Sequence, residues 1–321
     1  MAEATASTDP SRARAWLVAA RPQTLPAAAS PVLVGTGLAV HHDVAAPLPA
    51  LVALLGAALI QVGTNFANDY FDAVKGADDP DRAGFTRATA SGLLSPSAVR
   101  RAAALTFGLA VCSGTYLVYL GGLPILVVGL SSVVAGVAYT GGPYPLGYHG
   151  LGDVFVFVFF GLVAVAGTYY VQAVAAATAA VPAPAAAFPL APPAGTVPPS
   201  AVLAGVPVGA LATAILVVNN VRDRESDAAA GKRTLAVRLG DRASRLQYVA
   251  LLAVAYAVPC WYALAGGYGL AALAPLLTLP GAAVVTRTVR TAEGAALNRA
   301  LENTGKLLLA FSALFAAGLA L

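Results

Sequence analysis

Long apolar stretches separated by short polar segments run along almost the whole chain. A helix that crosses a lipid bilayer needs about 20 mostly apolar residues, and the chain offers nine such stretches. We expect spans at residues 24–40, 49–71, 99–120, 122–139, 153–175, 200–221, 246–265, 268–286 and 304–321. Residues 173–200 are rich in alanine and proline and carry no charge, which predicts a loop because proline interrupts a helix. The pattern indicates an all-α membrane protein with about nine transmembrane helices.

The composition is that of a chain surrounded mostly by lipid. Apolar residues make up 58% of the 321 positions and charged residues 11%, whereas charged residues make up about 25% of an ordinary soluble domain. So few charges cannot supply the polar surface of a soluble protein, which excludes that class. Cys112 and Cys260 each lie inside an apolar stretch without a metal-ligand partner at short spacing, so we expect no disulfide or metal site from them.

The positions of the cations predict the orientation of the chain. All 19 Lys and Arg residues lie before the first span, or in and beside the loops that join spans 2 and 3, 6 and 7, and 8 and 9. Short loops rich in Lys and Arg stay in the cytoplasm. We therefore expect a cytoplasmic N-terminus, an external C-terminus, a cytoplasmic tail over residues 1–20 and one transmembrane domain over residues 21–321. The net charge of +4 follows from this topology and is not a nucleic-acid signal.

Polar side chains gather where the second span ends. At 100° per residue, Asn65, Asn68, Asp69 and Asp72 fall within an arc of about 100° around the helix axis. Four polar groups on one face of an apolar helix are costly unless they meet a cavity, a cation or one another, so we expect them to line a site. The alternative is a helix that simply emerges into water, and this explains the acidic residues that follow at 78–81.

The sixth span ends in a similar way. Asn219, Asp223 and Asp227 recur every four residues, with Asn220 beside them. The two polar ends are four spans apart, on helices of the same direction, which indicates an internal pseudo-repeat with both motifs at the cytoplasmic face.

A substrate with a diphosphate group explains why two such motifs are paired. Two acidic faces repel a diphosphate, but they can hold Mg²⁺, which prefers oxygen ligands and keeps positions open for phosphate oxygens. Just beyond the carboxylates lie cations that could bind the remaining phosphate oxygens and stabilise the leaving diphosphate. These are Lys75, Arg82, Arg87, Lys232 and Arg233. The alternative is that they are ordinary cytoplasmic loop charges.

The paired motifs, Asn68-Asp69-x-x-Asp72 and Asp223-x-x-x-Asp227, resemble those of the UbiA-type superfamily of intramembrane prenyltransferases. Three further segments resemble the branch that prenylates 1,4-dihydroxy-2-naphthoate: Arg21–Pro26, Tyr139–Gly152 and Gly231–Leu235. The resemblance implies helices around a central cavity, two Mg²⁺ ions and transfer of a polyprenyl chain from its diphosphate to the naphthoate. CO₂ and diphosphate are lost and the product is a demethylmenaquinol, in a multi-pass cell-membrane protein of menaquinone biosynthesis.

The motifs and the resemblance together define the expected site. We expect metal ligation by Asn68, Asp69, Asp72, Asp78, Asp223 and Asp227, and catalytic roles for Asp69, Asp72, Asp223, Asp227 and Lys75. We expect substrate contacts from Arg21, Gln23, Asn65, Asn68, Lys75, Arg82, Arg87, Tyr139, Tyr148, Asn219, Asn220, Lys232 and Arg233. The tyrosines could stack on the naphthoate or stabilise a cationic allyl carbon, the alternative being aromatic residues at the membrane interface.

Other functions share part of this pattern. Other superfamily members use 4-hydroxybenzoate, homogentisate, haem or a phospho-sugar as acceptor, and only Arg21–Pro26 and Tyr139–Gly152 argue against them. A secondary transporter also has paired helix-end motifs from an internal repeat, but it places its ionisable residues near the middle of the membrane. A soluble prenyl diphosphate synthase has Asp-rich metal motifs but no reason for nine spans.

Overall fold

The computed structural model describes residues 11–76, 84–179 and 188–321, and within them the chain forms only helices and connecting loops. The helices are α1 (Arg12–Ala20), α2 (Leu25–His41), α3 (Pro47–Val74), α4 (Pro96–Ala138), α5 (Gly152–Val156), α6 (Ala164–Ala179), α7 (Pro199–Arg222), α8 (Arg224–Ala229), α9 (Leu235–Leu239), α10 (Asp241–Leu264), α11 (Leu279–Thr291) and α12 (Leu297–Ala320). A π-helical segment, η3 (Phe157–Val163), joins α5 to α6, and short 3₁₀ segments η1 (Pro22–Thr24), η2 (Leu146–His149), η5 (Leu270–Thr278) and η6 (Gly294–Ala296) complete the set.

Eight helical stretches of the described chain are long and apolar enough to cross a membrane, which confirms the predicted all-α membrane class. The longest, α4, has 43 residues and would measure about 64 Å if straight, twice the thickness of a bilayer core. It is interrupted at Gly122, whose φ of 66° and ψ of −151° are not helical. A Cβ added at Gly136 would lie 3.5 Å from the Phe107 ring. The two halves of α4 therefore lie side by side, and they match the spans expected over 99–120 and 122–139.

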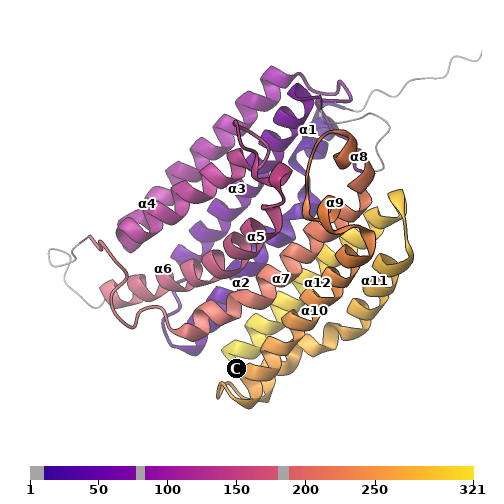
Figure 1. Cartoon of the computed structure of the whole chain (residues 1–321). Helices are drawn as coiled ribbons and strands as arrows, with labels where there is room; N and C mark the ends of the chain where they lie inside the picture. Colours follow the sequence, from indigo (N-terminus) through magenta and orange to yellow (C-terminus); the bar gives the residue numbers. More distant parts are fainter. Residues whose placement is uncertain (1–10, 77–83, 180–187) are drawn as a thin grey trace, which may run out of the picture.

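The helices pack around α7, which is the most buried of the membrane-spanning stretches. Figure 1 shows α3 and α4 on one side of α7, and α10, α11 and α12 on the other. The segment expected as an N-terminal tail contains α1, which packs against α3 through Trp16 and Phe66, with ring centroids 5.8 Å apart. Helices far apart in the sequence thus enclose one interior.

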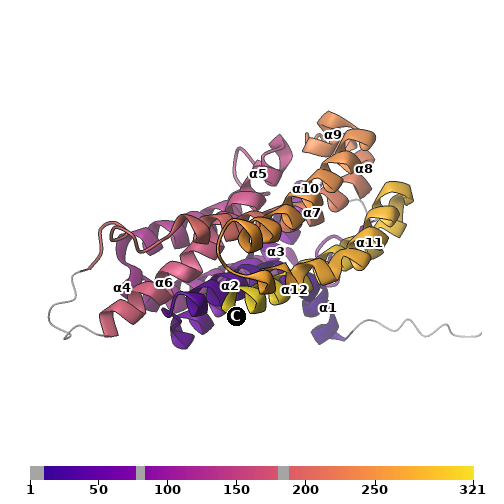
Figure 2. The same cartoon turned by 90° about the horizontal axis from the view of Figure 1, so that it is seen from below.

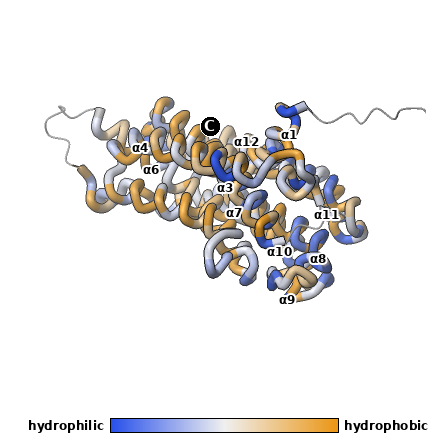
Figure 3. Tube along the Cα trace, turned by 90° about the horizontal axis from the view of Figure 1, so that it is seen from above, coloured by the Kyte–Doolittle hydropathy of each residue, from blue (hydrophilic) through white to orange (hydrophobic). Residues whose placement is uncertain are grey.

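Polar residues collect at one end of this bundle. The short helices α8 and α9 lie at the same end as α1 and the polar end of α11 (Figures 1 and 2). Figure 3 shows hydrophilic segments concentrated there, while the long helices are mostly hydrophobic along their length. The ends of α3 and α7 that carry the two polar motifs belong to this polar end. That it faces the cytoplasm stays a prediction.

Glycines allow a close contact between α7 and η3 in the interior. A Cβ added at Gly205 of α7 would lie 2.7 Å from the Gly161 carbonyl oxygen of η3, and one added at Gly209 would lie 2.6 Å from the Phe157 carbonyl oxygen. Small residues let membrane helices approach this closely and gain van der Waals contact.

We expect Gly205→Ala to destabilise the protein by roughly 1–3 kcal/mol, because backbone atoms of η3 must move to admit the methyl group. Gly167→Ala in α6 is the matched control, since no atom outside its own helix lies within 4 Å of the added Cβ. Thermal unfolding in detergent measures both variants. Equal melting temperatures for the two would contradict this account of the α7 contact.

Candidate active site

A cavity of about 490 Å³ opens between α2, α3, α4, η3, α6 and α7. Most of its wall is apolar and includes Ile60, Leu117, Val118, Ile125 and Phe159. Charged and amide side chains line it where α3 and α7 end: Asn68, Asp72, Arg87, Asn219, Asn220, Asp223, Asp227 and Lys232. The cavity therefore has an apolar part and one strongly polar end.

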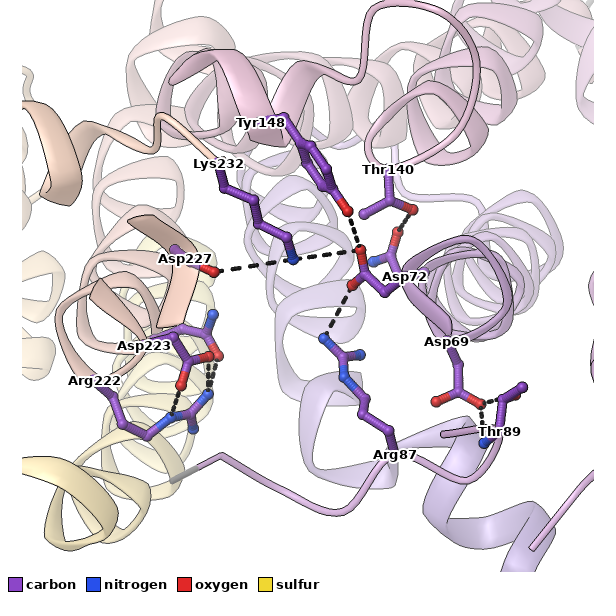
Figure 4. Close-up of polar contacts among 12 residues, drawn as sticks. Asp69, Asp72, Arg87, Thr89, Thr140, Tyr148, Arg222, Asp223, Asp227 and Lys232 are labelled. Atoms are coloured by element: carbon purple, nitrogen blue, oxygen red, sulfur yellow. Dashed lines mark hydrogen bonds and ion pairs between the residues drawn. The ribbon is translucent and has the colours of Figure 1, made fainter. Parts of the chain in front are cut away.

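Asp72, on the last turn of α3, is the centre of the polar end (Figure 4). Its Oδ1 accepts hydrogen bonds from the Tyr148 hydroxyl at 2.7 Å and from Lys232 Nζ at 3.4 Å. Its Oδ2 accepts one from the Arg87 guanidinium at 3.3 Å. A buried carboxylate needs such partners to stay ionised.

Lys232 links the two polar motifs. Its Nζ lies 3.4 Å from Asp72 and 3.9 Å from Asp227 Oδ1, and only 10% of its side chain is exposed. It also lies 4.7 Å from the centre of the Tyr148 ring. The backbone fixes this position, because the Lys232 N–H donates to the Asp227 carbonyl at 2.8 Å and the Arg233 N–H donates to the Tyr148 carbonyl at 2.8 Å.

Asp223 is held by its neighbour on α7. Arg222 donates to both carboxylate oxygens of Asp223, at 2.8 and 2.7 Å, and also to Asn219 Oδ1 at 2.6 Å and Asn298 Oδ1 at 2.7 Å. The continuous helix expected through Asp227 is interrupted, since α7 ends at Arg222 and Asp223 has φ −95° and ψ 6°. The Asp227 N–H still donates to the Asp223 carbonyl at 2.7 Å, and both side chains line the cavity.

Asp69 departs from the expected shared face. Its Oδ2 accepts hydrogen bonds from the Thr89 N–H at 3.0 Å and the Thr89 hydroxyl at 2.6 Å. Asp69 is not among the residues that line the cavity. Asp69 lies at the edge of the predicted arc, where the loop before α4 packs against α3. Asn65, Asn68 and Asp72 do line the cavity. The structure thus gives Asp69 a contact that holds a loop, in place of the expected position in the site.

The two asparagines of α3 are also hydrogen-bonded. Asn65 donates to the Ala20 carbonyl and to the Thr24 hydroxyl, both at 2.9 Å, and so fastens α3 to the N-terminal helices. Asn68 accepts a hydrogen bond from the Thr140 hydroxyl at 2.9 Å.

The remaining expected residues divide into three groups. Those that line the cavity are Arg21, Gln23, Arg87, Tyr139, Tyr148, Asn219, Asn220 and Lys232. Lys75 and Arg233 are exposed and do not line it, although Lys75 donates to the Thr140 carbonyl at 2.6 Å and lies 5.1 Å from the Tyr148 ring. Asp78 and Arg82 lie outside the described residues.

Tyr139 lines the cavity near its polar end. Burial, and then the carboxylates of Asp153, Asp227 and Asp72, raise the pKa of its phenol far above the usual value. Among the polar residues that line the cavity but were not expected from the sequence are Thr140, which follows Tyr139, and Gln61, whose signal is its spacing of four residues before Asn65.

The polar end carries oxygen donors whose chemistry suits Mg²⁺. Asp72, Asp223, Asp227, Asn68 and Asn219 supply carboxylate and amide oxygens, the ligands that Mg²⁺ prefers. Within residues 11–76, 84–179 and 188–321, no three acidic, histidine or cysteine side chains lie close enough together to hold a metal ion. Lys232 and Arg87 instead balance the charge of Asp72.

Proteins from several organisms are similar in sequence to this chain over most of its length. A 1,4-dihydroxy-2-naphthoate octaprenyltransferase of Escherichia coli (strain K12) is 40% identical over 248 residues, which is 75% of this chain and 74% of that protein. A protein of the same name from Mycobacterium tuberculosis is 41% identical over 240 residues, 75% of each chain. The UbiA prenyltransferase domain-containing protein 1 of Gallus gallus is 31% identical, over 96% of this chain and 85% of that protein.

Solved structures share the fold. The apo structure of a UbiA homologue from Aeropyrum pernix K1 matches with a TM-score of 0.65 and 16% identity, over 91% of this chain and 96% of that one. A UbiA homologue from Archaeoglobus fulgidus bound to GPP and Mg²⁺ matches with a TM-score of 0.59 and 14% identity, over 94% and 99%. The model of the UbiA prenyltransferase family matches residues 28–315. The chain folds as a helical bundle with two polar helix ends at one cavity, and its structural relatives share its overall fold. Because the family model and the sequence relatives also match most of its length, the chain belongs to the UbiA prenyltransferase family.

Proposed function

We propose that the protein transfers a polyprenyl chain from polyprenyl diphosphate to 1,4-dihydroxy-2-naphthoate, with loss of CO₂ and diphosphate, as a step of menaquinone biosynthesis. The observation that carries this proposal is a cluster of carboxylates and cations at one end of an apolar cavity. The 40% identity to a protein named as the octaprenyltransferase for this naphthoate supports the choice of acceptor. The polar end would face the cytoplasm, in line with the placement of all 19 Lys and Arg residues.

The apolar part of the cavity suits the tail of the donor. Ile60, Leu117, Val118 and Ile125 offer the prenyl chain a wall without polar groups to desolvate. The diphosphate would then lie at the polar end, among Asp72, Asp227 and Lys232.

Charge at the polar end decides how the diphosphate binds. Asp72, Asp223 and Asp227, with Asn68 and Asn219, would hold Mg²⁺, which we propose as two ions. When bound, the metal neutralises charge on the diphosphate as it leaves. Lys232 and Arg87 would exchange their contacts with Asp72 for contacts with phosphate oxygens, and the Tyr148 hydroxyl would keep Asp72 in place.

The reaction then needs no protein nucleophile. The allylic C–O bond breaks and its electron pair leaves with the diphosphate, while the electron-rich ring carbon that bears the carboxylate forms the new C–C bond. Loss of CO₂ returns the electrons of the C–CO₂⁻ bond to the ring and restores aromaticity. The apolar side chains of the cavity wall would keep water away from the allylic carbon, which water would otherwise capture.

Product analysis with separate acceptors tests this proposal. We expect purified protein with polyprenyl diphosphate and Mg²⁺ to convert 1,4-dihydroxy-2-naphthoate to a prenylated product. Mass spectrometry should show that this product has lost the carboxyl group of the acceptor. EDTA is expected to abolish the product and excess Mg²⁺ to restore it. Prenylation of 4-hydroxybenzoate or homogentisate, but not of the naphthoate, would show that the proposed acceptor is incorrect. No prenylation of any acceptor by folded protein would reject the function.

A further inference from the structure

One amide that lines the cavity, three helical turns from Asp72, has a buried oxygen with no hydrogen-bond partner among the described residues. Gln61 of α3 lines the cavity and is only 9% exposed. Its Oε1 is buried and accepts no hydrogen bond from any described residue. An unmatched buried acceptor costs free energy, so native proteins rarely keep one without a ligand or water to match it.

The position of Gln61 extends the polar face of α3 inward. Gln61, Asn65, Asn68 and Asp72 are spaced by four, three and four residues, which places all of them within an arc of about 60°. Gln61 lies about 16 Å along the helix axis from Asp72. The amides of Asn65 and Asn68 already bond to Thr24 and Thr140, whereas the amide oxygen of Gln61 has no partner within the described chain.

The two substrates differ in whether they carry a hydrogen-bond donor for the Gln61 oxygen. A prenyl tail carries no polar atom, so it cannot match the Gln61 oxygen. The aromatic acceptor has a hydroxyl that can. Its reacting carbon must meet the allylic carbon of the donor, which lies on the interior side of the diphosphate. The ring can then be oriented so that its 4-hydroxyl, two ring carbons from the reacting carbon, points away from the polar end and toward Gln61.

We propose that Gln61 accepts a hydrogen bond from the 4-hydroxyl of the naphthoate and so positions the ring and selects for a dihydroxylated acceptor. This assignment rests on the proposed function and adds to it a residue that fixes acceptor choice. The Gln61 oxygen is buried, and a buried polar group that lacks its partner discriminates strongly against an analogue without the matching hydroxyl.

The test compares two acceptors in the wild type and in Gln61→Met, which keeps the length of the side chain and removes the amide. The second acceptor is 1-hydroxy-2-naphthoate, which lacks the 4-hydroxyl. Its reacting carbon is still activated by the neighbouring 1-hydroxyl. We expect the variant to lose roughly tenfold in kcat/KM for the dihydroxy acceptor, mainly through KM, and to use the monohydroxy acceptor as well as the wild type does. The KM for polyprenyl diphosphate stays unchanged.

A stability measurement and a control variant make the result specific. Gln61→Met is expected to keep or raise the melting temperature, because it removes an unmatched buried group. Ser113→Ala, on α4 close to Gly56 of α3, is the control, since its hydroxyl already donates to the Ala110 carbonyl at 3.0 Å. It should leave the kinetics with both acceptors unchanged.

Three results would overturn the assignment while leaving the proposed function intact. These are an equal loss for both acceptors, a change confined to the KM of the donor, or no change at all in Gln61→Met. If the wild type prenylates neither naphthoate, the proposed function itself fails and the assignment with it.

Discussion

The Asp72→Asn variant is expected to lose prenyl transfer by a factor on the order of 10²–10³ and to keep its fold. Among the residues that the structure describes, Asp72 is the carboxylate that contacts Tyr148, Lys232 and Arg87 together, at 2.7, 3.4 and 3.3 Å. Asparagine keeps the shape and can still accept a hydrogen bond from Tyr148. It removes the negative charge that a metal ion at this site requires. Steady-state kcat with saturating substrates measures the effect.

Asp69→Asn is the matched control, on the same helix one turn away. Its carboxylate contacts Thr89 and does not line the cavity. We expect it to cost about 1–3 kcal/mol of stability, because the Thr89 N–H and hydroxyl lose a charged acceptor, and to retain most of the activity. Loss of activity as large as in Asp72→Asn, with stability unchanged, would instead give Asp69 the metal-binding role expected from the sequence.

Replacing Lys232 by Met is expected to have the second largest effect, a drop in kcat/KM for the donor on the order of 100-fold. Lys232 lies between Asp72 and Asp227 at the end of the cavity, and no other lysine lines it. The variant removes a cation that would bind the leaving diphosphate. It also leaves two buried carboxylates without that cation, which should cost about 3–5 kcal/mol of stability.

Arg233→Met controls for the general loss of positive charge. Arg233 is the next residue, but its side chain is exposed and lies outside the cavity, and it contributes its backbone N–H to the Tyr148 carbonyl. An exposed substitution of this kind changes stability by less than about 0.5 kcal/mol, and we expect the donor kinetics to stay the same. Equal losses in the two variants would mean that surface charge, and not the position of Lys232, supports activity.

The spans and the polar face of α3 were predictable because they depend on local patterns. Apolar length predicts a span, and a spacing of three and four residues places Asn65, Asn68 and Asp72 on one face. The loop contacts were not predictable from such patterns. Asp69 faces Thr89, twenty residues further along the chain, and Lys232 reaches Asp72 because its loop hydrogen-bonds to the loop of Tyr148. Both depend on how distant segments dock, which no local spacing encodes.

The break at Asp223 and the role of Gln61 show the same limit. The four-residue spacing of Asn219, Asp223 and Asp227 is typical of a continuous helix, yet Arg222 holds Asp223 and Asn298 of α12 at the point where α7 ends. Gln61 was counted within an apolar span because its neighbours are apolar. Only the folded chain shows that its amide oxygen is buried without a partner among the described residues.

Binding of an unreactive donor tests the central claim most directly, namely that the carboxylates and cations around Asp72 bind a prenyl diphosphate through Mg²⁺. The ligand is a prenyl thiolodiphosphate, whose C–S bond resists ionisation, and its affinity is measured without acceptor. We predict that Mg²⁺ tightens binding to the wild type roughly tenfold or more relative to EDTA, and that Asp72→Asn loses this gain. Equal affinity with Mg²⁺ and EDTA in the wild type, or a metal-dependent gain that survives in Asp72→Asn, would contradict the account.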